Sequence, residues 1–174
     1  MSASSKHRGL LLLLTLAAGI ALLVGWRLTQ DPRRREIRLI QQRVNQLATA
    51  LSFSDKSGLL NKVSYAERVA EYFSDPTDLR IAFGRWAVHE SVSRAQVTET
   101  ATGLRASAKG LDVQFLDIDV TLDPSGSTAT AHLTSKIYFH GDSDYWVQEF
   151  KLGLTQSNRV WRLKEVLTLK TMEQ

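Results

Sequence analysis

The 174-residue sequence contains no cysteine and only three prolines. Without cysteine, the chain can form neither a disulfide framework nor a thiolate site. Its four histidines are scattered, and no HxH or HExxH spacing occurs, so we expect no metal site and no cofactor. The sequence also lacks a glycine-rich phosphate loop and the Gly-x-Ser-x-Gly turn of serine hydrolases. Several large enzyme classes are therefore excluded by residue content.

Net positive charge is missing from most of the chain. Residues 1–35 contain six Lys and Arg against one acidic residue, a difference of +5, whereas residues 36–174 contain 16 against 17, a difference of −1. Nucleic-acid binding requires a basic face on the folded domain itself. We therefore expect no nucleic-acid partner.

One long apolar run is present. Leu10 to Trp26 carries no charge, and as a helix it would span roughly 26 Å, close to the hydrocarbon core of about 30 Å. A cleaved signal peptide and a buried core helix are the alternatives, but no small-x-small cleavage site comes after the run. We expect a retained transmembrane helix (a signal anchor) over residues 10–28, with a short basic N-terminus over 1–9 and a basic juxtamembrane segment over 29–35.

Arginines lie directly after the apolar run, at Arg27, Arg33, Arg34 and Arg35. They could contact anionic lipid headgroups, or they could be the solvated start of a helix. Counting Lys and Arg alone favours a cytoplasmic location for the domain downstream of the run. A short basic N-terminus before a leucine run is instead typical of a bacterial signal anchor, which exports the downstream domain.

Three helices are predicted in the remainder. Asp31-Pro32 is a helix-start signal, and apolar residues then recur at steps of three and four over roughly 20 residues. A second helix is expected from Leu59 to about Tyr72-Phe73, before a turn at Ser74-Asp75-Pro76. Ser93 is the expected N-cap of a third helix over 94–108.

Alternating residues predict strands. A short hairpin is expected over 79–88, and four long strands over 111–122, 128–140, 145–155 and 160–169. The first long strand slips in phase at Phe115-Leu116, as a bulge would produce. Short turns between the long strands indicate an antiparallel meander. Because helix faces and one sheet face must cover each other, we expect an α+β domain over 36–174, with three helices packed on a curved antiparallel sheet.

This order of elements resembles the nuclear transport factor 2-like (NTF2-like) superfamily, which includes ketosteroid isomerase and SnoaL-like polyketide cyclases. The resemblance covers about residues 36–169. It depends on the hairpin GLDVQFLDIDVTLDPSGSTATAHLTSKIYF and on the ending NRVWRLKEVLTL. It implies a conical sheet around a long helix, a pocket at the open end, and often a homodimer through the outer sheet face.

Catalysis in this superfamily uses a carboxylate or a His/Asp pair inside the apolar cone, where burial would raise the pKa of an acid. The candidates are His89, Glu90 and Asp119, and the alternative for each is an ordinary solvent-facing side chain in a loop or strand. No ionisable residue lies in phase with the apolar faces of the last three strands, which favours a cone filled by side chains. Aromatic residues could line a pocket or simply pack in the core: Tyr65, Tyr72, Trp86, Tyr138, Trp146 and Trp161.

The leading hypothesis is a non-enzymatic binding or assembly module anchored in the bacterial inner membrane by one helix. Its partners would be the membrane, through residues 10–28, and a protein partner or second copy at the sheet face. The resemblance favours the periplasmic over the cytoplasmic side for the domain. The alternatives are a small-molecule-binding or isomerase/cyclase-like enzyme that uses the cone, and an inner-membrane scaffold component of type IV secretion.

Overall fold

The computed structural model describes residues 31–54, 59–83 and 86–169, with the backbone alone for 59–63, 83 and 86. The chain divides into two compact units, Met1–Glu36 and Ile37–Gln174. The transmembrane helix expected over 10–28 and Arg27 lie outside the described residues. Within the described ranges, none of the helices is long and apolar enough to cross a membrane.

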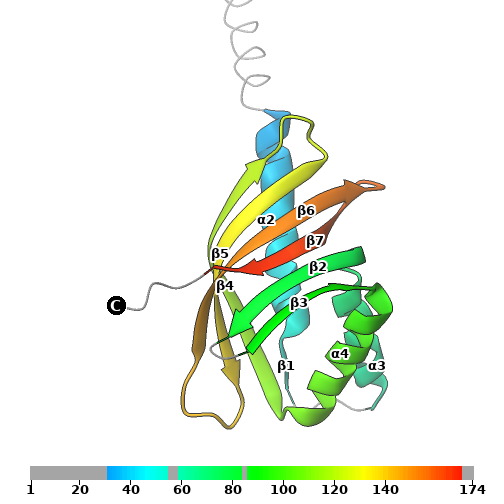
Figure 1. Ribbon diagram of the computed structural model, residues 1–174, viewed down its shortest axis with the longest axis vertical. Helices are drawn as coiled ribbons and strands as arrows, with labels where there is room; N and C mark the ends of the chain where they lie inside the picture. Colours follow the sequence, from blue (N-terminus) through cyan, green and yellow to red (C-terminus); the bar gives the residue numbers. More distant parts are fainter. Residues whose placement is uncertain (1–30, 55–58, 84–85, 170–174) are drawn as a thin grey trace, which may run out of the picture. The chain divides into compact units, whose positions relative to one another are not determined.

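Three helices and seven strands make up the described part of the chain (Figure 1). The first helix is α2, which begins where Asp31 accepts a hydrogen bond from the Arg33 amide at 3.0 Å, as the Asp-Pro signal predicts. In chain order the elements are α2 (Pro32–Leu51), β1 (Phe53–Ser54), α3 (Leu59–Ala70), β2 (Phe73–Phe83), β3 (Trp86–Val92), α4 (Arg94–Ser107), β4 (Gly110–Leu122), β5 (Thr128–Phe139), β6 (Trp146–Ser157) and β7 (Val160–Thr168).

The strands form one strongly curved sheet in the order β1-β4-β5-β6-β7-β2-β3 (Figure 1). The predicted meander of four long strands is confirmed, since β4, β5, β6 and β7 pair antiparallel in sequence. The predicted hairpin is also present, but β2 lies parallel to β7, so the expectation of a purely antiparallel sheet is wrong. Turn residues fix hairpins locally, whereas the neighbour of β2 is decided by packing between distant segments.

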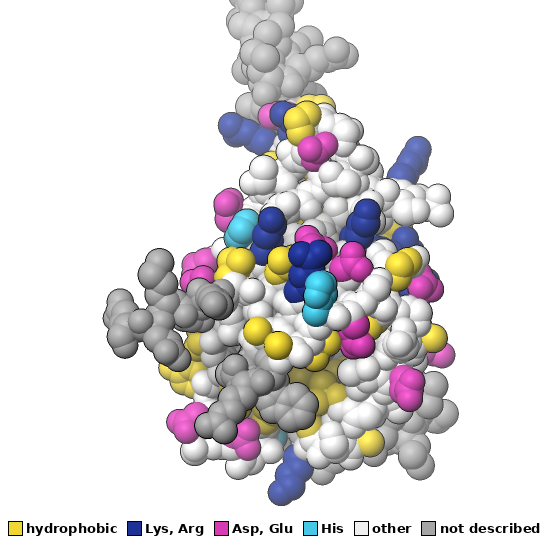
Figure 2. All heavy atoms as spheres, viewed as in Figure 1, with side chains coloured by type: hydrophobic (Ala, Val, Ile, Leu, Met, Phe, Trp, Pro, Cys, Tyr) yellow, Lys and Arg dark blue, Asp and Glu magenta, His cyan; other side chains and the backbone are white. Residues whose placement is uncertain are grey.

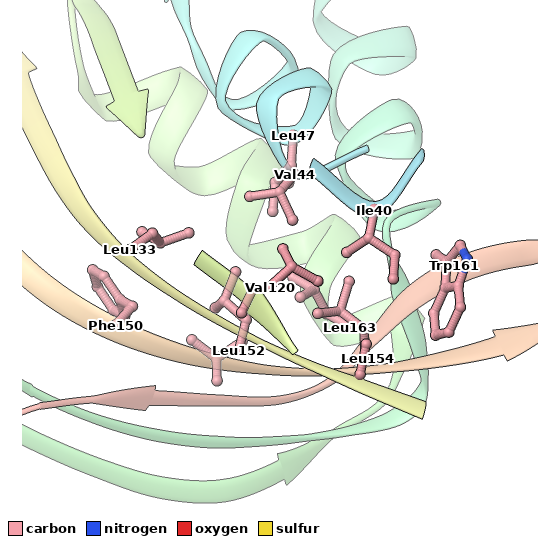
Figure 3. Packing of buried hydrophobic residues seen from close by; sticks show 13 residues of the cluster. Ile40, Val44, Leu47, Val120, Leu133, Phe150, Leu152, Leu154, Trp161 and Leu163 are labelled. Carbon is pink, nitrogen blue, oxygen red and sulfur yellow. The ribbon is translucent and has the colours of Figure 1, made fainter. Parts of the chain in front are cut away.

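Helix α2 packs its apolar stripe on the inner face of the sheet. Ile40, Val44 and Leu47 are at most 3% exposed and share one cluster with residues of β4 to β7 (Figure 3). Their spacing of four and three residues places them on one face of the helix. This stripe holds the long helix inside the curve of the sheet.

A second apolar cluster joins α3, α4 and the start of β4. It includes Tyr65, Ala66, Ala101 and Leu111. Helix α4 begins as predicted, because the Ser93 hydroxyl accepts from the Gln96 amide and the Gln96 side chain returns to the Ser93 amide, a capping box.

Strand phase differs from the sequence expectation in two places. The slip expected at Phe115-Leu116 lies between Leu116 and Asp119, with Asp117 in a left-handed conformation, and Leu116 is 44% exposed. A second slip, not foreseen, places Lys164 between the paired positions of Leu163 and Glu165 in β7. A bulged residue has no partner across the ladder, and this exchanges the two faces of the strand.

The turn expected at Ser74-Asp75-Pro76 is an irregular segment inside β2, which contains the cis Asp75-Pro76 peptide. Thr77, which is fully buried, donates to the Leu163 carbonyl oxygen of β7 at 2.9 Å. This contact ties β2 to β7 beside the irregular segment.

Candidate cavity inside the curved sheet

A cavity of about 480 Å³ lies between the inner face of the sheet and helices α3 and α4. Of its 26 lining residues, 21 are apolar, and they come from α2, α3, α4 and every strand but β1. Figure 2 shows hydrophobic side chains in a hollow in the lower half of the face viewed there. The cavity volume falls in the ordinary range for small-molecule sites.

The cavity opens between β3 and α4. Among the lining residues, four are exposed, and these are Val88 and Glu90 on β3 and Gln96 and Thr100 on α4. The other lining residues are buried or half-buried. We refer to these four residues as the mouth.

The expectation that side chains fill the cone is therefore wrong. That expectation was based on the absence of ionisable residues from the inner strand faces. The number of charged residues on an inner surface indicates how polar that surface is. It does not indicate how much space remains between the helices and strands that face each other. Small residues such as Ala101 on α4 contribute to that space.

Five lining residues carry polar groups, and three of these are at the mouth. The fourth is Tyr65, whose hydroxyl donates to the Leu51 carbonyl oxygen at 2.9 Å. Burial raises the pKa of the Tyr65 hydroxyl to about 12, an effect that the nearby Arg105 charge partly offsets. Tyr65 is therefore a neutral wall group near neutral pH.

The fifth polar group is the hydroxyl of Ser135 on β5. Ser135 is 1% exposed, and its Oγ has no hydrogen-bond partner among the described residues. A buried hydroxyl without a partner costs about 1–3 kcal/mol. Ser135 is thus a polar group in an otherwise apolar wall.

The three catalytic candidates occupy different places. Glu90 lines the cavity at its mouth, whereas His89 is exposed and does not line it. Successive residues of a strand face opposite sides, so His89 and Glu90 cannot both face the cavity. Asp119 is exposed, and it pairs in register with His132 on the side of the sheet away from the cavity.

Of the six predicted pocket aromatics, Tyr65 lines the cavity. Trp161 is buried in the cluster around α2 (Figure 3), and Tyr72 lies beneath the Arg43 guanidinium at 3.8 Å. Tyr138 and Trp146 are 37% and 54% exposed and lie outside the lining. The Trp86 side chain is outside the described residues.

The arginines expected near lipid are described in part. Arg33, Arg34 and Arg35 are exposed in the first turn of α2. That turn contains no acidic residue. Within the described ranges, no three His, Asp or Glu side chains gather as a metal site would require.

Sequence reasoning missed Ser135 and Arg105. Ser135 continues the alternation of Ala129, Ala131 and Leu133 on the inner face of β5, so its phase alone could have identified it. Arg105 has no such signal, because an arginine on a helix is ordinarily exposed.

No family model matches the chain, and no curated protein sequence matches it. Several solved structures match the chain in fold. A candidate scytalone dehydratase of Novosphingobium aromaticivorans matches with a TM-score of 0.60 at 14% identity, over 82% of this chain and 88% of that chain. An NTF2-like protein of unknown function from Pseudomonas putida KT2440 matches with a TM-score of 0.58 at 11% identity, over 78% and 87%.

A third structure, an NTF2-like protein with a cystatin-like fold from Novosphingobium aromaticivorans, matches with a TM-score of 0.53 at 18% identity, over 81% of this chain and 88% of that chain. Similarity at these identities extends to the fold alone. The described domain therefore has the NTF2-like fold, with a curved sheet around a long helix and an open apolar cavity.

Proposed function

We propose that this protein is a membrane-anchored, non-enzymatic binding module of the bacterial envelope that takes an apolar small molecule into its cone. The observation that carries the proposal is the open cavity of about 480 Å³, whose lining is 21 of 26 residues apolar. Covering apolar cavity surface with an apolar ligand is favourable by about 25 cal/mol per Å² removed from water.

The chemistry of the lining favours binding over catalysis. Proton-transfer catalysis requires an acid or base within reach of the reacting group. Among the described lining residues, Glu90 is the single carboxylate, it lies at the mouth, and no lysine, arginine or histidine accompanies it. The alternative, an isomerase- or cyclase-like enzyme, would depend on Glu90.

The membrane anchor belongs to the same proposal. Residues 10–28 would span the inner membrane and hold the domain on the periplasmic side. The start of α2 supports a nearby anionic surface, because residues 31–35 present three exposed arginines against the single capping carboxylate of Asp31. Anionic headgroups would attract that basic segment. Tethering would also keep the cavity close to a bilayer, where apolar molecules concentrate.

Photo-crosslinking tests the cavity. The full chain in lipid nanodiscs is labelled with a diazirine-bearing aliphatic alcohol, and labelled peptides are mapped by mass spectrometry. We expect label on β5 and α4 peptides, and at least a tenfold loss of that label in Ala101→Trp, which fills the cavity. The matched control is Ala95→Trp, an exposed position on the same helix.

Label found only in residues 10–28, or equal cavity label in both tryptophan variants, would overturn the binding proposal. Turnover of a cyclisable or isomerisable probe that Glu90→Gln abolishes would favour the enzyme instead.

A further inference from the structure

The cavity wall contains one buried hydroxyl that has no partner among the described residues. Ser135 stands between Leu133 and Ile137 on β5, opposite Phe115 of β4 in register, and all four line the cavity. Its Oγ is inaccessible to water and has no hydrogen-bond partner within the described residues. An alanine at position 135 would complete the wall without the free-energy cost of a buried, unpaired hydroxyl.

A ligand group could supply the missing partner if the Ser135 side chain changes rotamer, because its Oγ is closed to water in the present rotamer. A serine hydroxyl both donates and accepts, so once turned toward the cavity it can pair with an alcohol or a carbonyl. Fully apolar ligands leave Ser135 unsatisfied. The geometry therefore favours a molecule that is apolar over most of its surface and has one neutral hydrogen-bonding group.

The charges of the lining residues disfavour a fatty carboxylate. No lysine, arginine or histidine is among the described lining residues, so a buried carboxylate would have no counter-charge. At the mouth, the Glu90 carboxylate would repel a carboxylate left at the surface. Arg105 is not among the residues that line the cavity, and its guanidinium packs against the Phe53 and Tyr65 rings instead.

We propose that the cavity selects an uncharged lipophile with a single alcohol or carbonyl group that hydrogen-bonds Ser135, and that Glu90 at the mouth rejects the corresponding carboxylate. This inference depends on the binding proposed above. It assigns Ser135 and Glu90 as specificity residues.

Competition against the photo-label tests the assignment, with decanol, decanoate and decane as matched competitors in nanodiscs. Each competitor partitions into lipid to the same extent for every variant. The quantity compared is therefore the ratio of its apparent affinity for the variant to its apparent affinity for the wild type. Ser135→Ala should weaken decanol about fivefold, the loss of one hydrogen bond of about 1 kcal/mol, and leave decane unchanged. Thr134→Ala, on the other face of β5, is the control.

Glu90→Gln should strengthen decanoate several-fold and leave decanol unchanged, with Glu99→Gln on α4 as the exposed control. Ser135→Ala should also raise the melting temperature of the ligand-free protein, which separates a lost contact from misfolding. Provided that the cavity is still labelled, either of two results would overturn the inference. One is an equal effect of Ser135→Ala on decanol and decane, and the other is decanoate binding that Glu90→Gln does not change. Absence of cavity label would instead overturn the proposed function.

Discussion

Arg105 is a buried cation that no carboxylate neutralises among the described residues. Its guanidinium lies 4.4 Å from the centre of the Phe53 ring and 5.3 Å from that of Tyr65, and it donates to the Ser54 carbonyl oxygen at 3.3 Å. Aromatic ring faces and carbonyl oxygens are both electron-rich. Arg105 therefore joins α4 to β1 and α3 behind the cavity without a salt bridge.

Tyr65 gives the protein an alkaline limit of stability. The unfolded chain releases the phenolic proton near pH 10, whereas burial delays release to about pH 12 in the folded protein. Stability from this group is complete below pH 10 and is lost as pH rises to 12, because the unfolded state then binds fewer protons. The loss should be about 2 to 3 kcal/mol, from the two-unit difference.

Urea unfolding at pH 9 and pH 11.5 measures this effect. Tyr65→Phe should lower the free energy of unfolding by about 1 kcal/mol at pH 9, where the hydrogen bond to Leu51 is lost. The difference between variant and wild type should shrink or reverse at pH 11.5. Tyr138→Phe, at an exposed tyrosine, should keep the wild-type pH dependence. A Tyr65→Phe profile parallel to the wild type would contradict the prediction.

At the scale of elements, α2 is the structural centre of the domain, and its two faces should differ sharply. Ile40 is fully buried and Leu39, its neighbour, is 43% exposed. Ile40→Ala should lower the free energy of unfolding by about 2–5 kcal/mol, because it leaves a hole in the core. Leu39→Ala should change the free energy of unfolding by no more than about 0.5 kcal/mol. Chemical denaturation of both variants measures the contrast, and equal losses would mean that α2 packs differently.

Element boundaries were predictable from sequence where local chemistry sets them. The capping pair Ser93 and Gln96 starts α4, and Asp31-Pro32 starts α2, as expected. Strand phase was less predictable, since the slip at Lys164 in β7 has no glycine or proline in its own strand. The glycine at the slip, Gly153, lies on the paired strand β6. A bulge is a property of two paired strands, and a single segment does not record it.

At the scale of the whole molecule, the proposed anchor predicts an integral membrane protein with an exported domain. Expressed in a Gram-negative bacterium, the full chain should stay in the membrane after carbonate extraction, and protease added to spheroplasts should digest the domain. Ile20→Arg should shift the protein to the soluble fraction, because an arginine at the centre of a spanning helix costs about 2.5–3.5 kcal/mol.

Thr29→Arg, beyond the proposed span, is the control and should remain in the membrane. Complete protection of the domain in intact spheroplasts would place it in the cytoplasm. A wild-type chain recovered in the soluble fraction would remove the anchor altogether.

The sequence by itself determined the α+β class, the three helices and the meander of long strands, because periodicity, caps and turns are local properties of the chain. The tertiary structure decided the parallel neighbour of β2, the burial of Arg105 and the open cavity. Each of these depends on how segments far apart in sequence fit together. The space left inside a curved sheet is a sum over all facing elements, and no single segment contains it.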